Sequence, residues 1–408
     1  MKFIHTADIH LDSPLCGLVR YEGAPIEEMQ MATRRAFSNL IDLACQEAVD
    51  FVLIAGDLYD GDWRDYNTGL FFNKQINRLR EAKIPVFIVH GNHDAASNLT
   101  RQLRLPDNVT QFSARHPETV ILEHCQVAIH GQSFATKAVT DDLSMAYPTA
   151  LPDYFNIGLL HTSANGREGH SPYAPCTLNT LINKGYDYWA LGHIHQFEIL
   201  NKLPYVVFSG NLQGRHIRET GAKGCVLVEV EGRRINQVTQ QFIDVLRWEI
   251  GQIDITDLTQ TDELLEKIRE QVIQFIQQAD GRPLAIRLII KGSSILCHEL
   301  QSNREQWQNE IRAVVTEASH EQVWLEKVNF NLREMSDSPF KIEGALSELE
   351  KTLNFLMNDE SSLQELAKEF RALPPEIRKV YGFDPEQPET IQQLFGEVQS
   401  LLLSRLSK

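Results

Sequence analysis

Residues 85–94 of the chain read PVFIVHGNHD, and this stretch decides the fold that we predict. The apolar, β-branched run at residues 86–89 is typical of a buried strand. Gly91 then permits a sharp turn, which delivers Asn92, His93 and Asp94 directly after the strand. Three polar side chains at the end of a buried strand add nothing to a core, so the stretch predicts a functional site.

Four further segments follow the same plan, in which an apolar run ends in Asp or His. They read HTADIH (residues 5–10), FVLIAGDLYD (51–60), IGLLHTS (157–163) and WALGHIH (189–195). The candidate site residues that they add are Asp8, His10, Asp57, His161, His193 and His195.

Each segment taken singly also fits a turn, or a loop histidine that only satisfies backbone groups. All five in this order favour a metal site instead. Oxygen and imidazole donors suit divalent metals, and two such ions roughly 3.5–4 Å apart can share one carboxylate. Asp57 is the natural candidate for that bridge.

Two segments with helical periodicity, residues 27–47 and 66–82, alternate with the first three strands. The predicted buried positions are Ala36, Phe37, Leu40, Ile41 and Ala44 in the first helix, and Leu70, Phe71, Ile76 and Leu79 in the second. This alternation implies right-handed crossovers and parallel strands, with the polar residues gathered at one end of the sheet.

The shorter strands after residue 109, including residues 205–210 and 224–232, are assigned to a second sheet packed on the first. We therefore predict an α/β fold, a two-sheet sandwich over residues 1–245. Residues 246–336 alternate strand and helix and predict a small α+β domain. Residues 337–408 predict amphipathic helices, which pack either on their own domain or on a partner helix.

The composition limits the possible functions. A formal net charge of −16 argues against a free-standing nucleic-acid clamp, since such binding relies on Lys and Arg. Six scattered cysteines suggest neither a zinc module nor a disulfide framework. The polar N-terminus does not fit a signal peptide, and no run approaches the roughly 18 apolar residues of a membrane span. We expect a soluble cytoplasmic protein with no membrane partner.

A basic segment, NLQGRHIRETGAKG at residues 211–224, follows the last candidate ligands. Its glycines and cations predict a flexible loop that approaches a phosphate backbone through Arg215, His216 and Arg218. The alternative is a solvated connector. His90 and His130 also end apolar runs, and we interpret both as structural.

These five motifs resemble those of the calcineurin-like metallophosphoesterases, over residues 1–245. The resemblance implies that one metal ion is bound by Asp8, His10, Asp57 and His195, and a second by Asp57, Asn92, His161 and His193. It implies that His93 is the catalytic histidine that stabilises or protonates the leaving oxygen. Asp94 would orient His93 through a hydrogen bond.

The chemistry implied by this site is phosphoester hydrolysis. Two cations lower the pKa of a bridging water and neutralise charge on the phosphoryl oxygens, so hydroxide attacks phosphorus in line. No Ser or Cys nucleophile is required.

The domain order, with HTADIHLDSP and SGNLQGRHIRET, resembles the SbcD-type DNA repair nuclease subunits, and among them the bacterial YhaO branch. That resemblance implies Mn²⁺-dependent DNA exonuclease or endonuclease activity, and a middle domain that caps the site. It also implies a C-terminal tail that binds an SMC-like coiled-coil ATPase, and a possible homodimer. One departure is Asp60, where some nuclease relatives have histidine. The alternatives are a phosphodiesterase or phosphatase for small phosphoesters, and a mainly structural partner of an ATPase.

Overall fold

The computed structural model describes residues 1–13, 31–59, 66–95, 104–164, 173–320, 322–333 and 345–359, together with residues 368, 395, 398 and 402. Several predictions fall outside these residues: the start of the first helix at 27–30, the departure at Asp60, the boundary at 336–337 and most of the C-terminal helices.

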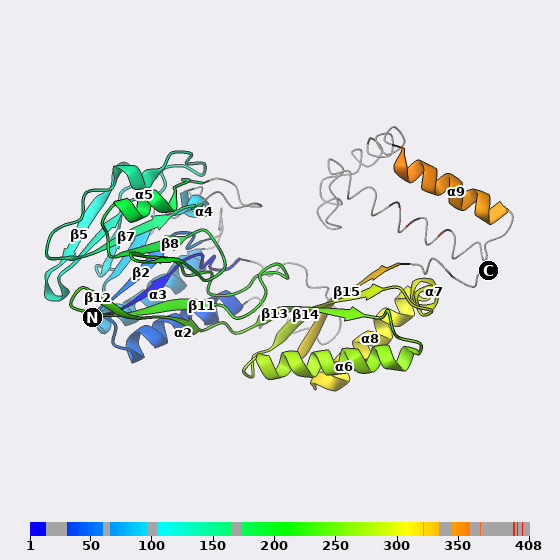
Figure 1. The fold of residues 1–408 in the computed structure, drawn as a ribbon. Helices are drawn as coiled ribbons and strands as arrows, with labels where there is room; N and C mark the ends of the chain where they lie inside the picture. The colour runs from blue at the N-terminus through cyan, green and yellow to red at the C-terminus, as the bar shows by residue number, and fades with distance from the viewer. Residues whose placement is uncertain are drawn as a thin grey trace. The chain divides into compact units, whose positions relative to one another are not determined.

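The first sheet has six strands in the order β12-β11-β1-β2-β3-β4. Its parallel part consists of β1 (Lys2–Thr6), β2 (Phe51–Ala55), β3 (Val86–Val89) and β4 (Val109–Gln111), in a register that pairs Ile4 with Val52. The strands β11 (Gly224–Glu231) and β12 (Arg234–Phe242) complete it, and β11 runs antiparallel to β1. Figure 1 shows the blue β1 region and the green β11 in one sheet. Our assignment of residues 224–232 to the second sheet was therefore wrong.

Two helices connect the parallel strands, α2 (Ala32–Gln46) and α3 (Tyr66–Glu81). The buried face that we predicted for α2 is confirmed, but in α3 Leu70 is 60% exposed. Phe72 is fully buried and stacks on Phe37, with ring centroids 5.6 Å apart. Phe72, Ile76 and Leu79 are spaced four and three residues apart on one helical face, and Leu70 lies outside that spacing.

The second sheet has the order β5-β6-β7-β8-β10-β9. Its strands are β5 (Glu118–Leu122), β6 (Val127–Gly131), β7 (Phe155–His161), β8 (Tyr188–Gly192), β9 (Glu198–Lys202) and β10 (Tyr205–Phe208). Short helices are α4 (Asn92–Ala95), α5 (Leu178–Asn183), η1 (Glu123–Cys125) and η2 (Leu143–Ala146). Phe3 of the first sheet meets the edge of Tyr188 of the second at 5.3 Å, within a continuous buried apolar cluster. The two-sheet sandwich is thus confirmed.

The α+β region contains β13 (Arg247–Asp254), α6 (Thr261–Gln278), β14 (Leu284–Gly292), α7 (Cys297–Ser302), α8 (Arg304–Ser319) and β15 (Val323–Leu332). Its sheet order is β13-β14-β15, and the short α7 is an element that we did not predict. The helix α9 (Ala345–Asn358) follows. Among the described residues, no helix is long and apolar enough to cross a membrane.

The chain divides into two compact units. One holds residues 1–250, 275–286 and 322–326, and the other holds 251–274, 287–321 and 327–408. The division between residues 245 and 246 that we inferred from the sequence stays a prediction.

Candidate metal centre

Polar side chains meet where strands of both sheets end. Asp8 and His10 follow β1, Asp57 follows β2, and His193 follows β8. All four have positive φ, at 49°, 44°, 50° and 106° respectively. Because non-glycine residues rarely adopt this conformation, their backbone strain points to a functional region.

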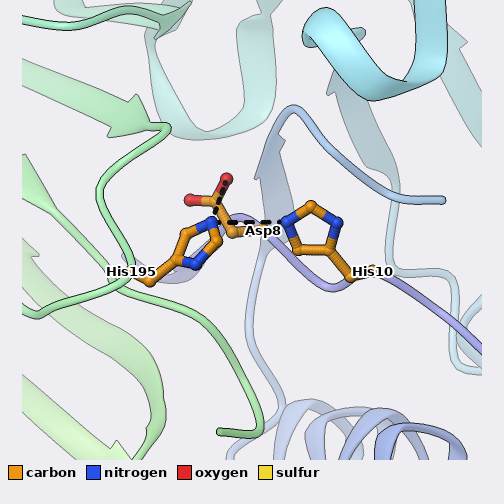
Figure 2. Close-up of side chains that lie close together, drawn as sticks. All are labelled: Asp8, His10 and His195. Atoms are coloured by element: carbon orange, nitrogen blue, oxygen red, sulfur yellow. Dashed lines mark hydrogen bonds and ion pairs between the residues drawn. The ribbon is translucent and has the colours of Figure 1, made fainter. Parts of the chain in front are cut away.

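The first group of donors comprises Asp8, His10 and His195 (Figure 2). His195 Nε2 lies 3.3 Å from His10 Nε2 and 3.7 Å from Asp8 Oδ1. Asp8 Oδ1 is buried and has no hydrogen-bond partner in the described part of the chain. Three donors that converge on one point in this way suit a divalent cation.

A second group joins His161 to the end of β2. His161 Nδ1 lies 2.9 Å from the carbonyl oxygen of Ala55. Since a carbonyl only accepts, Nδ1 carries the proton and Nε2 presents its lone pair. That Nε2 lies 3.5 Å from Asp57 Oδ2 and 3.0 Å from Asn92 Oδ1. Nitrogen and oxygen acceptors thus face one another, which is the arrangement that a cation stabilises.

Asp57 stands between these groups, since its donor atoms lie within 4.8 Å of those of Asp8 and His161 and also of those of His10 and His93. Donor atoms of six of the seven predicted ligands thus lie close to those of another, namely Asp8, His10, Asp57, Asn92, His161 and His195. His193, the seventh, also contacts two of them: its ring lies edge-on to that of His161, with centroids 5.3 Å apart, and its backbone N–H donates to Asp8 Oδ2.

The electrostatics of the centre favour cation binding. Burial, followed by the charge of Asp57, raises the pKa of Asp8 well above its ordinary value. A cation beside both carboxylates would offset this repulsion. Burial lowers the pKa of His195 to about 4, so its ring is neutral, as a ligand must be, at neutral pH.

His93 is half-buried beside the centre. Its backbone N–H donates to Asp57 Oδ1 at 2.9 Å, and its ring stands edge-on to that of His10, with centroids 4.9 Å apart. This position suits a group that exchanges a proton with a molecule bound at the centre.

Asp94 makes several contacts that we did not predict. Its buried carboxylate accepts hydrogen bonds from the backbone amides of Leu58, Tyr59 and Gly91, and lies 3.6 Å from His90 Nδ1. Although burial opposes it, the contact with His90 and the amides holds the pKa of Asp94 below its usual range. Asp94 therefore fixes the loops after β2 and β3, and its role in orienting His93 stays a prediction.

The basic segment at residues 211–224 is packed into the structure. Arg215 and His216 both face Glu219, at 3.2 and 3.6 Å, whereas the side chain of Arg218 is exposed. Because most of the segment is buried, the alternative of a solvated connector is wrong there, whereas contact with a phosphate backbone stays a prediction. Of the three predicted substrate-binding residues, Arg218 is exposed, and the side chain of His216 is 37% exposed despite its contact with Glu219.

Glu219 is a site residue that our sequence analysis missed. Its carboxylate lies 2.7 Å from His195 Nδ1. The only available signal was that it is the single acid in RHIRETGAK, within the basic segment that follows the last ligand strand. We overlooked Glu219 because we interpreted the whole segment as basic from its excess of cationic side chains.

The other residues singled out from the sequence have structural environments. His130 is buried and bonds to Thr119 and Asn156, in keeping with a structural role. Cys176, Cys225 and Cys297 are buried, free thiols.

Comparisons with known proteins bear on this centre. Residues 1–197 match the family model of calcineurin-like phosphoesterases, and residues 248–333 match that of the middle domain of metallophosphoesterase YhaO. The uncharacterised metallophosphoesterase YhaO of Bacillus subtilis (strain 168) is 37% identical over 298 residues, which are 72% of each chain.

Two solved structures are also similar. TT1561 of Thermus thermophilus is 13% identical, with a TM-score of 0.33, over 59% of this chain and 98% of the other. A dimetal phosphatase from Danio rerio is 10% identical, with a TM-score of 0.36, over 56% of this chain and 92% of the other.

Proposed function

Because the chain belongs to the calcineurin-like metallophosphoesterases and is homologous to YhaO, we propose that it hydrolyses phosphodiesters with two divalent metal ions, preferably Mn²⁺. The observation that carries this proposal is the convergence of donors from the ends of four strands, namely Asp8, His10, Asp57, His161 and His195. When bound, two cations would supply an activated water and would neutralise charge at phosphorus.

The residues of the chain supply the remaining parts. Asp57 would contact both ions, since its carboxylate lies near the donor atoms of both groups, while Ala55 fixes the tautomer of His161. His93 is anchored by Asp57 and would give a proton from its imidazole to the leaving oxygen. Asp94 holds the loops that carry these groups.

We further propose that the polymer substrate is DNA and that the chain is the nuclease subunit of a repair complex. The support is the resemblance of HTADIHLDSP and SGNLQGRHIRET to SbcD-type subunits. An SMC-like ATPase bound by residues 337–408 would supply cations for the DNA, since this chain carries a net charge of −16.

A second candidate is hydrolysis of small phosphoesters. Glu219 contacts Arg215 and His216, two of the three side chains that we expected to face a phosphate backbone. That arrangement favours a substrate that needs few contacts outside the metal centre.

One experiment separates these proposals. Wild type and His93→Ala are incubated with Mn²⁺ and either bis-p-nitrophenyl phosphate, end-labelled linear DNA or closed circular DNA. We expect both kinds of diester to be cut and both activities to fall by about 10²–10⁴-fold in the variant. Cleavage of the small diester alone, even with the ATPase added, would refute the DNA assignment. No cleavage of any diester by Mn²⁺-loaded wild type would refute the proposed function.

A further inference from the structure

Glu219 is a buried carboxylate beside a predicted ligand, with only 6% of its surface exposed. Burying a carboxylate is costly unless several groups stabilise it. Here Oε1 contacts His195 Nδ1 at 2.7 Å and Arg215 Nη2 at 3.2 Å, while Oε2 accepts from the backbone N–H of Arg215 and from Asn211 Nδ2. The number of these contacts indicates that Glu219 is ionised and held in one orientation.

The contact with His195 fixes which ring nitrogen carries the proton. An ionised carboxylate only accepts, so at 2.7 Å His195 must donate from Nδ1. The guanidinium of Arg215 also lies 3.4 Å from this nitrogen, but the shorter contact is with Glu219. Nε2 therefore presents its lone pair to Asp8 and His10.

A second contact fixes the backbone of the same residue. Lys223 is buried, and its Nζ donates to the carbonyl oxygen of His195 at 2.9 Å. Ring and backbone of His195 are thus both held by the segment at 211–224.

We propose that Glu219 is a positioning residue, which holds His195 in the Nδ1–H tautomer so that Nε2 can bind a metal ion together with Asp8 and His10. This inference rests on the proposed function only in assuming that the centre binds metal. It also assigns the segment at 211–224 a role in metal binding in place of contact with a phosphate backbone.

The test measures metal affinity and does not depend on turnover. Wild type, Glu219→Leu and Glu219→Gln are titrated with Mn²⁺, and free Mn²⁺ is followed by electron paramagnetic resonance. Loss of such an outer partner typically weakens metal binding by about 10–100-fold. We expect this loss for one of two ions in Glu219→Leu, and a smaller loss in Glu219→Gln, whose amide oxygen still accepts from Nδ1–H. The exposed Glu231→Gln is the matched control and should bind like wild type.

A double-mutant cycle separates positioning from a general structural effect. If Glu219 acts through His195, its replacement should change the Mn²⁺ affinity little in a His195→Gln background. Equal losses in both backgrounds, or unchanged affinities in both folded Glu219 variants, would overturn the inference; if Glu219→Leu fails to fold, Glu219→Gln decides. If the wild type binds no Mn²⁺, both the proposed function and this inference are refuted.

Discussion

His161 Nδ1 donates a hydrogen bond to the carbonyl oxygen of Ala55 over 2.9 Å, and so joins the end of β7 to the end of β2. The contact crosses from one sheet to the other and sets the tautomer of a candidate ligand. It is possible because the next residue is Gly56, where a Cβ would collide with the His161 ring.

We predict that Gly56→Ala displaces His161. Its φ of +93° disfavours a side chain, and the added methyl group overlaps the imidazole. Overpacking of this kind costs about 1–3 kcal/mol, and the affinity for one Mn²⁺ ion should fall as well. Denaturant unfolding and Mn²⁺ titration measure the two effects.

Gly232→Ala is the matched control for this substitution. Gly232 also has a positive φ, of 58°, but a Cβ there would meet nothing within 4 Å. The Gly232→Ala variant should therefore show the backbone strain without any change in Mn²⁺ affinity. Equal Mn²⁺ affinities in Gly56→Ala and wild type would contradict the prediction.

Asp57→Asn should separate stability from metal binding. Asp57 is buried near Asp8, and its charge contributes to raising the pKa of Asp8. Removing one of two repelling carboxylates should leave the melting temperature in chelator unchanged or higher. At a Mn²⁺ concentration of 100 Kd, metal binding raises the free energy of unfolding of the wild type by about 2.7 kcal/mol. Asp57→Asn should lose most of this gain. Thermal melts with and without Mn²⁺ measure both quantities.

The exposed Asp107→Asn serves as the control, because it removes the same charge from a side chain outside the predicted ligand motifs. It should retain the full Mn²⁺-induced stabilisation. A Mn²⁺ response of normal size in Asp57→Asn would exclude Asp57 as a ligand.

The candidate ligands could be identified from the sequence because each lies at the end of a strand or shortly after it. Parallel strands bring their ends to one edge, so Asp8, Asp57 and Asn92 needed only a correct assignment of β1, β2 and β3. For these three residues, the local sequence pattern and the rule that parallel strands end at one edge were sufficient.

The remaining features depend on pairings between distant residues. The partner of β1 is β11, more than 200 positions later, and Glu219 contacts His195 across 24 positions of loop and strand. Such contacts leave no local period in the sequence, which is why our predictions failed at these two positions. The error at Leu70 is of another kind, because the helical spacing of Phe72, Ile76 and Leu79 was a local signal that we did not use.

Asp94→Ala should destabilise the protein more than His93→Ala does. The substitution leaves the buried amides of Leu58, Tyr59 and Gly91 without their acceptor. An unsatisfied buried donor costs about 1–3 kcal/mol, so we expect a total loss of about 3 kcal/mol or more. Urea denaturation measures this loss.

Asp94→Asn retains one accepting oxygen and should fall between wild type and Asp94→Ala. If Asp94 acted mainly by orienting His93, both Asp94 variants would lose activity while keeping the stability of wild type. That outcome would support the role that we predicted for Asp94 from the sequence.

The pH dependence of stability should reflect His5, which links the two sheets. Its ring is fully buried, with Nδ1 3.0 Å from the hydroxyl of Tyr188 and Nε2 3.1 Å from the carbonyl oxygen of Leu191. The neutral ring satisfies both partners, donating to Leu191 and accepting from Tyr188. Burial lowers the pKa of His5 to about 3, whereas an exposed histidine titrates near 6.5.

Between these two values the unfolded chain binds a proton that the folded chain does not. Stability must therefore fall as the pH falls, by about 2 kcal/mol between pH 7 and pH 5 from this residue. His5→Gln removes the titration, so its free energy of unfolding should decrease less over the same interval, whatever its stability at pH 7. Urea denaturation in chelator at the two pH values gives the comparison. If the decrease is the same in both proteins, His5 is not held neutral by the fold.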